Sequence, residues 1–227
     1  MVSSPCYRTY MKISNIKRIK TKHLIVFDLD GTLTPTKAPM DREMSRLFAR
    51  LLTVKKVAVV GGGKYGLFKT QFVRRLKAPK PLLKNLSLFP TTATAFYRYR
   101  GGWKKVYAHY LSHAEKKRIK QAFRAVFAQI KYRHPAKTYG TVIEDRGTQI
   151  TFSALGQEVV AMLGKKKGVA LKEKWLRENN AVKMKIARLM SRRLPDMEIR
   201  AAGFTSVDVT KKGIDKAYGL HQIYKHT

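Results

Sequence analysis

The sequence predicts an α/β protein with a parallel-sheet core and a second, α+β domain inserted into that core. Two observations support this fold class. The N-terminal part alternates short continuous apolar runs with amphipathic stretches, as buried parallel strands and helices do. The middle part shows alternating strands around glycine turns, which is typical of antiparallel pairs. We therefore expect a basic extension over residues 1–22, a core formed by 23–82 and 210–227, and an inserted domain, here called the cap, over 83–209.

The predicted core starts with the apolar run "HLIVFD", which ends at Asp28 and suits a buried strand. The following stretch "DREMSRLFARLLTV" has apolar residues at helical spacing, and Asp41 stands where it can cap that helix. A second strand, "KKVAVV", leads into three glycines at 61–63, and "YGLFKTQFVRRL" begins another helix. In this order the loops that follow the strands share one edge of a parallel sheet, where open α/β sheets bind ligands.

The predicted cap contains both helices and hairpins. Strands surround the Gly101-Gly102 turn, and "AEKKRIKQAFRAVFAQI" is a strongly amphipathic helix. The stretch "TVIEDRGTQITFSAL" alternates across a turn at Arg146-Gly147, which predicts a hairpin. A basic helical stretch follows between Lys167 and Leu194, and "MEIRAAGFTSVDV" supplies one or two further strands.

The charge of the chain is unusual, since 48 basic and 14 acidic residues give a net charge of +34. Such a chain binds polyanions nonspecifically at low salt, because each neutralised phosphate releases counterions. The basic residues run from Arg8 to Lys225 without zinc-finger spacing or another nucleic-acid reading motif. We expect a solvated basic surface, and dedicated nucleic-acid binding is the alternative.

The N-terminal segment and the single cysteine bear on location. Residues 1–22 contain basic and serine residues but no acid, which is compatible with a transit peptide or with a frayed extension of an already basic chain. No apolar run approaches the roughly 18 residues of a membrane span. Cys6 has no cysteine partner in the chain, which suits a reducing compartment. We expect a soluble cytoplasmic protein.

The run "FDLDGTLT" carries the strongest chemical signal. It places Asp28 and Asp30 at the carboxyl end of a buried strand, where two like charges are costly unless a ligand uses them. Magnesium suits such carboxylates, so both are predicted metal ligands. With a phosphate present, one carboxylate can attack phosphorus and the other can carry the proton. Gly31 allows the chain to turn away, and Thr32 can offer a hydroxyl and an N–H to phosphoryl oxygens. The alternative is a strand that ends in an Asx turn.

This run resembles motif I of the haloacid dehalogenase superfamily, whose phosphatases and phosphomutases have a Rossmann-like core. The resemblance implies that Asp28 forms an aspartyl-phosphate and that Asp30 protonates the leaving oxygen. From residue 23 to about 221, the chain looks like the phosphomannomutase-like branch with an inserted α+β cap. In that branch the lysine of motif III holds the transferring phosphoryl group, and Lys216 in "GIDKAYGL" matches it.

The same resemblance implies further binding residues. Gly62 lies in the glycine-rich turn of motif II, and Arg146 matches an arginine that binds the sugar phosphate. Ser206 and Asp208 in "TSVDV" match a serine and an aspartate that contact sugar hydroxyls. For Arg146 and Ser206 the alternative is ordinary polarity at a hairpin tip and on a strand.

The chain also departs from that branch. The turn at 61–63 offers no hydroxyl to the phosphate, and Lys37 and Gln157 stand where mutases carry phosphate-binding arginines. Lys37 remains a candidate phosphate ligand. Because a mutase must hold a second phosphate, these departures favour a phosphatase over a mutase.

A fourth motif, a metal-binding acidic loop, would follow Lys216 by on the order of 20 residues, whereas the sequence given extends to Thr227. The resemblance therefore implies weak magnesium binding and low turnover for these residues. The expected function is magnesium-dependent phosphoryl transfer on a small phosphorylated sugar, with mannose phosphate as the preferred candidate. The alternative is a catalytically degenerate basic protein that binds nucleic acid or other polyanions.

Overall fold

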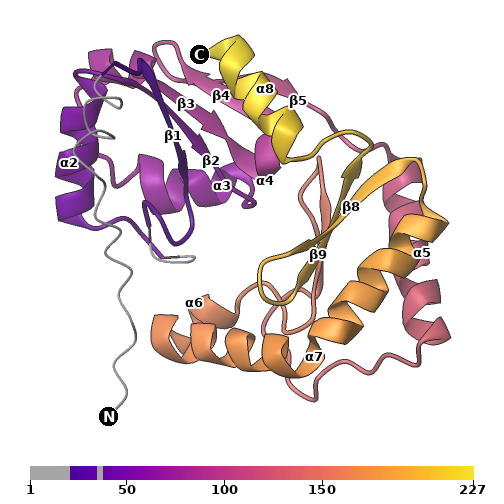
Figure 1. The fold of residues 1–227 in the computed structure, drawn as a ribbon. Coiled ribbons are helices and arrows are strands. Elements are labelled where there is room, and N and C mark those ends of the chain that lie inside the picture. Colours follow the sequence, from indigo (N-terminus) through magenta and orange to yellow (C-terminus); the bar gives the residue numbers. More distant parts are fainter. Residues whose placement is uncertain (1–20, 35–37) are drawn as a thin grey trace.

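The computed structural model describes residues 21–34 and 38–227, which form two sheet-containing parts (Figure 1). Cys6, Lys37 and most of the expected basic extension lie outside the described residues. Each part has its own sheet and its own apolar core. The chain enters the second part after β5 and returns to the first before α8, so the second part is an insertion into the first.

The first part is built on a mixed sheet with the strand order β1-β2-β3-β4-β5. Strands β1, β2 and β3 are parallel, and β4 and β5 continue the sheet in antiparallel fashion. The strand bounds are β1 (Leu24–Asp28), β2 (Lys56–Val60), β3 (Leu86–Phe89), β4 (Ala95–Tyr99) and β5 (Trp103–Ala108). The two strands that end in the predicted aspartate and glycine motifs are therefore direct neighbours.

Helices cover both faces of this sheet. Successive side chains of β2 point to opposite faces and pack against different helices. Val57 and Val59 pack with Phe48 of α2 (Arg42–Leu52), whereas Ala58 packs on the other face with Ile223 of α8 (Lys216–His226). Asp41 caps α2 as predicted, since its side chain accepts a hydrogen bond from the N–H of Met44. Short helical segments complete the part: α3 (Tyr65–Leu67), η1 (Phe68–Val73), η2 (Lys80–Asn85) and α4 (Pro90–Ala93).

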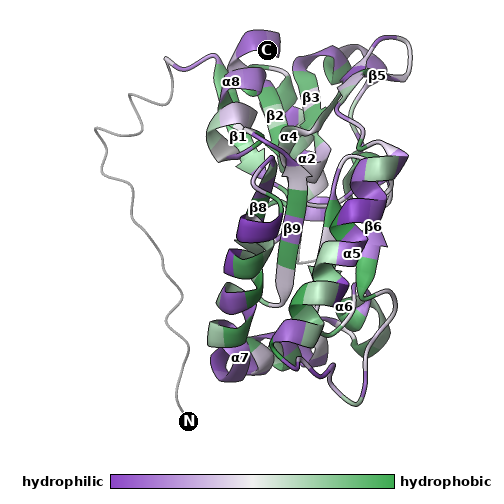
Figure 2. Ribbon diagram, turned by 90° about the vertical axis from the view of Figure 1, so that its right-hand side faces the viewer, coloured by the Kyte–Doolittle hydropathy of each residue, from purple (hydrophilic) through white to green (hydrophobic). Residues whose placement is uncertain are grey.

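The second part is a four-stranded antiparallel sheet of order β6-β7-β9-β8, with α5 and α7 packed against each other on one side (Figure 1). The bounds are β6 (Ile143–Asp145), β7 (Ile150–Ser153), β8 (Met197–Ala202), β9 (Ser206–Lys211), α5 (His113–Gln129), α6 (Val159–Leu163) and α7 (Lys165–Arg193). Hydrophilic turns alternate with hydrophobic ones along both long helices, as expected for helices with one buried face (Figure 2). The open face of the sheet is turned toward the first part.

The sheet membership of residues 86–108 differs from the expected domain division. Strands β3, β4 and β5 lie in that segment, which was assigned to the cap, yet they hydrogen-bond in the first sheet. The local pattern identifies an antiparallel hairpin but does not say which sheet it joins, and antiparallel edges on parallel sheets are common. We propose that the cap spans about residues 111–211. Within the described residues, no helix combines the length and apolar character that crossing a membrane requires.

Candidate active site

The Asp-x-Asp motif lies at the carboxyl edge of the parallel strands. Asp28 is the last residue of β1 and pairs in register with Val60, the last residue of β2. Immediately beyond, Gly31 has a φ of 83°, and its N–H donates to the carbonyl of Thr34 at 2.7 Å. This left-handed glycine turns the chain back and leaves Asp28 and Asp30 directed into a cleft. The glycine turn after Val60 borders the same cleft.

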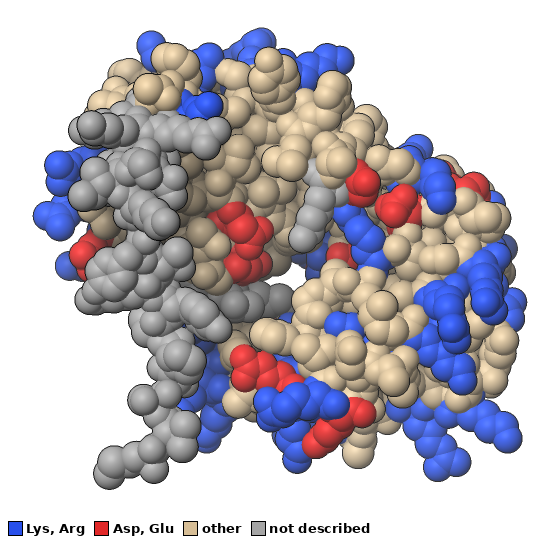
Figure 3. All heavy atoms as spheres, in the orientation of Figure 1, with Lys and Arg blue, Asp and Glu red and all other residues tan. Residues whose placement is uncertain are grey.

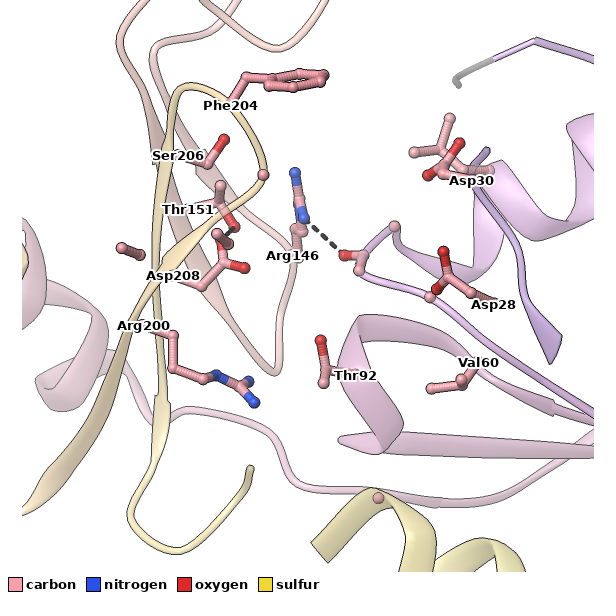
Figure 4. A pocket seen from close by; sticks show the side chains of 18 of the residues that line it. Asp28, Asp30, Val60, Thr92, Arg146, Thr151, Arg200, Phe204, Ser206 and Asp208 are labelled. Carbon is pink, nitrogen blue, oxygen red and sulfur yellow. Dashed lines mark hydrogen bonds between the residues drawn. The ribbon is translucent and has the colours of Figure 1, made fainter. Parts of the chain in front are cut away.

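The cleft lies between the two parts and has a volume of about 790 Å³. Acidic side chains border the hollow on the core side in the space-filling view (Figure 3). Asp28 and Asp30 face Arg146, Ser206 and Asp208 across it (Figure 4). Residues predicted from two distant segments of the sequence therefore line one cavity.

Arg146 joins the cap to the core. Its Nη1 donates to the carbonyl of Gly62 at 2.7 Å (Figure 4). Its Nε donates to Glu144 at 2.8 Å, and its Nη2 donates to the Oε1 of Gln157 at 3.0 Å. Its side chain is only 8% exposed. Each nitrogen of the guanidinium thus donates to a protein acceptor. Phosphate binding by Arg146 remains a prediction, and the observed role is a link between the hairpin tip and the motif II turn.

The charge of Glu144 is stabilised by this link. Burial alone would raise the pKa of Glu144, but Arg146 and Lys64 together hold that pKa below its usual value. Lys64 belongs to the core and lies 3.0 Å from the carboxylate of Glu144. The ion pair between Lys64 and Glu144 therefore also bridges the two parts, and Lys64 directly follows the glycine turn.

Strand β9 supplies the polar groups on the cap wall. Asp208 is 7% exposed and accepts a hydrogen bond from the hydroxyl of Thr151 at 2.8 Å. Burial raises the pKa of Asp208, although Arg146 and Arg200 act in the opposite direction. Ser206, on the same strand, is partly exposed to the cleft. These groups offer hydrogen-bond donors and acceptors to a polar substrate.

Thr92 was not predicted and also lines the cleft (Figure 4). Thr91, Thr92 and Ala93 all have positive φ, which is uncommon for residues other than glycine. The N–H groups of Thr91 and Thr92 donate to the carbonyls of Gly63 and Gly61, each at 2.9 Å. Strain of this kind often concentrates at functional sites. The available signal was the threonine pair at 91 and 92, which follows the apolar strand "LSLF" after Pro90.

One predicted residue does not line the cleft, and the side chains of two others lie outside what the structure describes. Thr32 is exposed and is not among the residues that line the cavity. Lys216 is the first residue of α8, and its side chain, like the whole of Lys37, lies outside what the structure describes. Their proposed phosphate contacts therefore stay predictions.

The donor set of the cleft suits a hard cation. Among the described residues, no group of three or more His, Cys, Asp or Glu side chains is gathered as a metal cage. Asp28 and Asp30 nevertheless present two carboxylates to one cavity. Magnesium is commonly held by one or two carboxylates together with water and substrate phosphate oxygens, so these residues fit it.

A parallel-sheet core with an Asp-x-Asp motif at its edge and an α+β cap over that motif defines a haloacid dehalogenase-like hydrolase fold. A haloacid dehalogenase-like hydrolase from Bacteroides thetaiotaomicron matches with a TM-score of 0.55 and 14% identity, over 89% of this chain and 76% of that chain. The chain is also a distant homologue of phosphomannomutase 1 from Mus musculus, with 24% identity over 211 residues, 91% of this chain and 75% of that protein.

A second structural match is the IMP-bound IMP-nucleotidase of Plasmodium falciparum, with a TM-score of 0.59 and 13% identity. It covers 89% of this chain, which spans about half of the nucleotidase chain (55%). No established protein-family profile matches the sequence. The predicted fold class and the resemblance to the haloacid dehalogenase superfamily are confirmed.

Proposed function

We propose that the protein transfers a phosphoryl group from a small phosphorylated molecule, with Asp28 as the nucleophile and Asp30 as the general acid and base. The observation that carries this proposal is that Asp28 and Asp30 line one cleft with polar groups of the cap. A covered cleft can hold a small ester against the carboxylates and limit access of water.

The reaction has two steps. A carboxylate oxygen of Asp28 attacks phosphorus, the bond between phosphorus and the ester oxygen breaks, and the proton of Asp30 goes to the departing alkoxide. Asp30 then takes a proton from water, whose oxygen attacks phosphorus and displaces the carboxylate of Asp28. Inorganic phosphate leaves, and both aspartates return to their initial state.

The carboxylate of Asp28 and the main-chain carbonyl of Asp30 would hold magnesium, which when bound supplies positive charge that offsets the phosphoryl oxygens. The N–H groups of the glycine turn lie beside Asp28 and would add donors, since motif II contributes no hydroxyl here. Thr92 adds a hydroxyl to the same wall of the cleft.

For the substrate we propose a small phosphorylated sugar, with mannose phosphate first in the panel because of the phosphomannomutase relative. Ser206 and Asp208 supply the hydrogen-bonding groups that sugar hydroxyls need. The nucleotidase match, whose structure contains IMP, makes a nucleoside monophosphate the second choice. Hydrolysis is favoured over the mutase reaction because Gln157 replaces an arginine and Arg146 is engaged by the protein.

Magnesium removal tests this proposal. We expect turnover of mannose 6-phosphate and p-nitrophenyl phosphate to need added magnesium and to stop with excess EDTA, because without a cation the two carboxylates repel the phosphate. Phosphate release should return when magnesium is restored. Equal rates with magnesium and with EDTA would contradict the proposed site.

A second candidate function, binding of nucleic acid, is favoured by one face of α7. Its outward side lies opposite the buried Lys172 and Met190 and exposes basic residues almost without acids: Lys167, Lys174, Arg177, Lys185, Arg188 and Arg192. A solvated helix usually mixes both signs, because like charges one or two turns apart repel. A row of phosphates would relieve that repulsion.

Matched triple variants test this second candidate. Replacement of Lys167, Lys185 and Arg188 by glutamine should weaken binding of a DNA duplex at least about tenfold at low salt, since each phosphate contact contributes to affinity. The control replaces three exposed residues on the surface of the core domain by glutamine, namely Lys69, Arg74 and Lys77. It removes the same amount of positive charge. Equal effects of the two triples in fluorescence anisotropy would show that binding follows net charge alone and would rule out a dedicated site on α7.

A further inference from the structure

The side of the cap sheet that borders the cleft carries a buried chain of polar side chains. Ile150 and Phe152 of β7 pack in the apolar core of the cap. Side chains alternate along a strand, so Gln149 and Thr151 point to the opposite side, which borders the cleft. Thr151 lies directly opposite Asp208 of β9 in the strand register. Gln149 is 0% exposed and Thr151 is 1% exposed, so the protein encloses both polar groups.

The hydrogen bonds along this chain have a defined direction. The Nε2 of Gln149 donates to the Oγ1 of Thr151 at 2.7 Å. A threonine hydroxyl has a single hydrogen, which here points away from the donating amide and toward Asp208. Thr151 donates this hydrogen to the Oδ1 of Asp208 at 2.8 Å. One carboxylate oxygen of Asp208 is thus held by the cap, and the other is directed into the cleft (Figure 4).

Packing alone does not explain why residue 149 is a glutamine. Among the described residues, the Oε1 of Gln149 is buried and has no hydrogen-bond partner. A buried acceptor without a donor lowers stability, and an apolar side chain of similar size would avoid that loss. A buried polar group left in this state therefore needs a reason other than packing. Its contact with Thr151 supplies one, because the amide orients the threonine hydroxyl.

The hydroxyl of Thr151 also favours the charged form of Asp208. Burial raises the pKa of Asp208, while Arg146 and the hydrogen bond from Thr151 act in the opposite direction. An ionised carboxylate only accepts hydrogen bonds, so it suits hydroxyl donors and repels a second acidic group. The oxygen of Asp208 that faces the cleft is therefore an acceptor held in a defined position.

We propose that Thr151, oriented by Gln149, is a positioning residue that holds Asp208 in place to accept a hydrogen bond from a hydroxyl group of the substrate. The inference rests on the proposed function, in which Asp208 binds the leaving part of a phosphate ester. Without the hydroxyl of Thr151, the carboxylate of Asp208 would lose its fixed orientation and part of its charge. The pair of residues 149 and 151 thus acts through Asp208 and favours esters whose leaving part carries hydroxyl groups.

The kinetic test compares Thr151→Val, which removes the hydroxyl and keeps the shape, with Thr151→Ser, which keeps a hydroxyl. The substrates are mannose 6-phosphate and p-nitrophenyl phosphate, whose leaving part carries no other hydroxyl. For Thr151→Val we expect the ratio of kcat/KM for mannose 6-phosphate to kcat/KM for p-nitrophenyl phosphate to fall about tenfold, mainly through KM. Thr151→Ser should retain the wild-type ratio. No fall with valine, or an equal fall with serine, would overturn the proposal.

A matched control is Thr210→Val. Thr210 is also buried in the cap sheet, and its hydroxyl donates to the carbonyl of Ile214 at 3.3 Å. It is not among the residues that line the cleft, so its replacement should leave the ratio unchanged. A fall as large as that of Thr151→Val would show that the loss of any buried hydroxyl in this sheet has the same effect.

Gln149→Met separates positioning from stability. The substitution removes the amide that orients Thr151, and it also removes the buried acceptor that has no partner among the described residues. We therefore expect the ratio of kcat/KM values to fall while the unfolding temperature stays the same or rises. A ratio equal to that of the wild type would exclude the orienting role of Gln149.

A binding measurement separates this inference from the proposed catalysis. In an Asp28→Asn background, mannose 6-phosphate should raise the unfolding temperature more than the same concentration of inorganic phosphate does. The added Thr151→Val substitution should remove most of this difference and leave the effect of inorganic phosphate unchanged. If no ester is hydrolysed but the difference depends on Thr151, the catalytic proposal fails and the positioning role stands. No difference between the two ligands, or a difference that valine does not change, would refute the positioning role.

Discussion

Replacement of Asp28 by asparagine is expected to lower phosphatase turnover on the order of 10⁴-fold or more, because it removes the attacking carboxylate while keeping the size of the side chain. Asparagine should also fit the end of β1, where Asp28 is exposed to the cleft. The measurement is release of p-nitrophenol and, independently, labelling by beryllium fluoride, which should be lost.

A matched control is Asp41→Asn. Asp41 caps α2 away from the cleft, and asparagine is an equally good helix cap, so activity and stability should be retained. Enzymes that lose a covalent nucleophile keep far less than a tenth of their activity. An activity of Asp28→Asn above about a tenth of the wild-type value would therefore show that Asp28 is not the nucleophile.

Arg146→Met is expected to destabilise the protein by about 2–3 kcal/mol, because it leaves the half-buried Glu144 and the carbonyl of Gly62 without their donor. Chemical denaturation measures the loss. The control is Arg118→Met, which breaks an exposed pair with Asp196 and should have a much smaller effect. Equal losses in the two variants would mean that Arg146 does not link the cap to the core.

The difference in stability between wild type and Arg146→Met is expected to depend on pH through Glu144. Its pKa is lowered in the folded protein, so its contribution is fully present above the pKa of a free glutamate and is lost as pH falls through the folded pKa. The stability gap between wild type and Arg146→Met should therefore be largest near neutral pH and shrink in acid. A stability difference that stays constant from neutral to acid pH would show that Arg146→Met destabilises the protein through lost packing.

The positions of Asp28 and Gly62 could be predicted because they follow from a general property of parallel sheets. Neighbouring strands end at one edge, so any polar motif at two such ends is brought together. The hairpin tip at Arg146 was equally visible, since a glycine turn within an alternating stretch fixes it locally. Its contact with Gly62 was not predictable, because it depends on how the cap is placed over the core.

Lys172 and the membership of β3–β5 illustrate what the sequence leaves open. Lysine is abundant in this chain, so residue type alone gives no signal that Lys172 is buried and lines the cleft. The available clue was its position on the helix. Lys172 lies on the same helical face as Gly168 and Trp175, where an apolar residue is expected. For β4 and β5 no such clue exists, since an antiparallel hairpin has the same local pattern in either sheet.

Strand β1 has a described neighbour on one side only, namely β2, and Val26 in its middle is 38% exposed. The strand that carries the nucleophile thus also presents main-chain groups that can pair with another extended segment. The net charge of +34 opposes such pairing between copies of the chain. That repulsion acts over about 10 Å at roughly 0.1 M salt and over about 3 Å at roughly 1 M salt. Added salt is therefore expected to weaken the protection of this edge against pairing between copies of the chain.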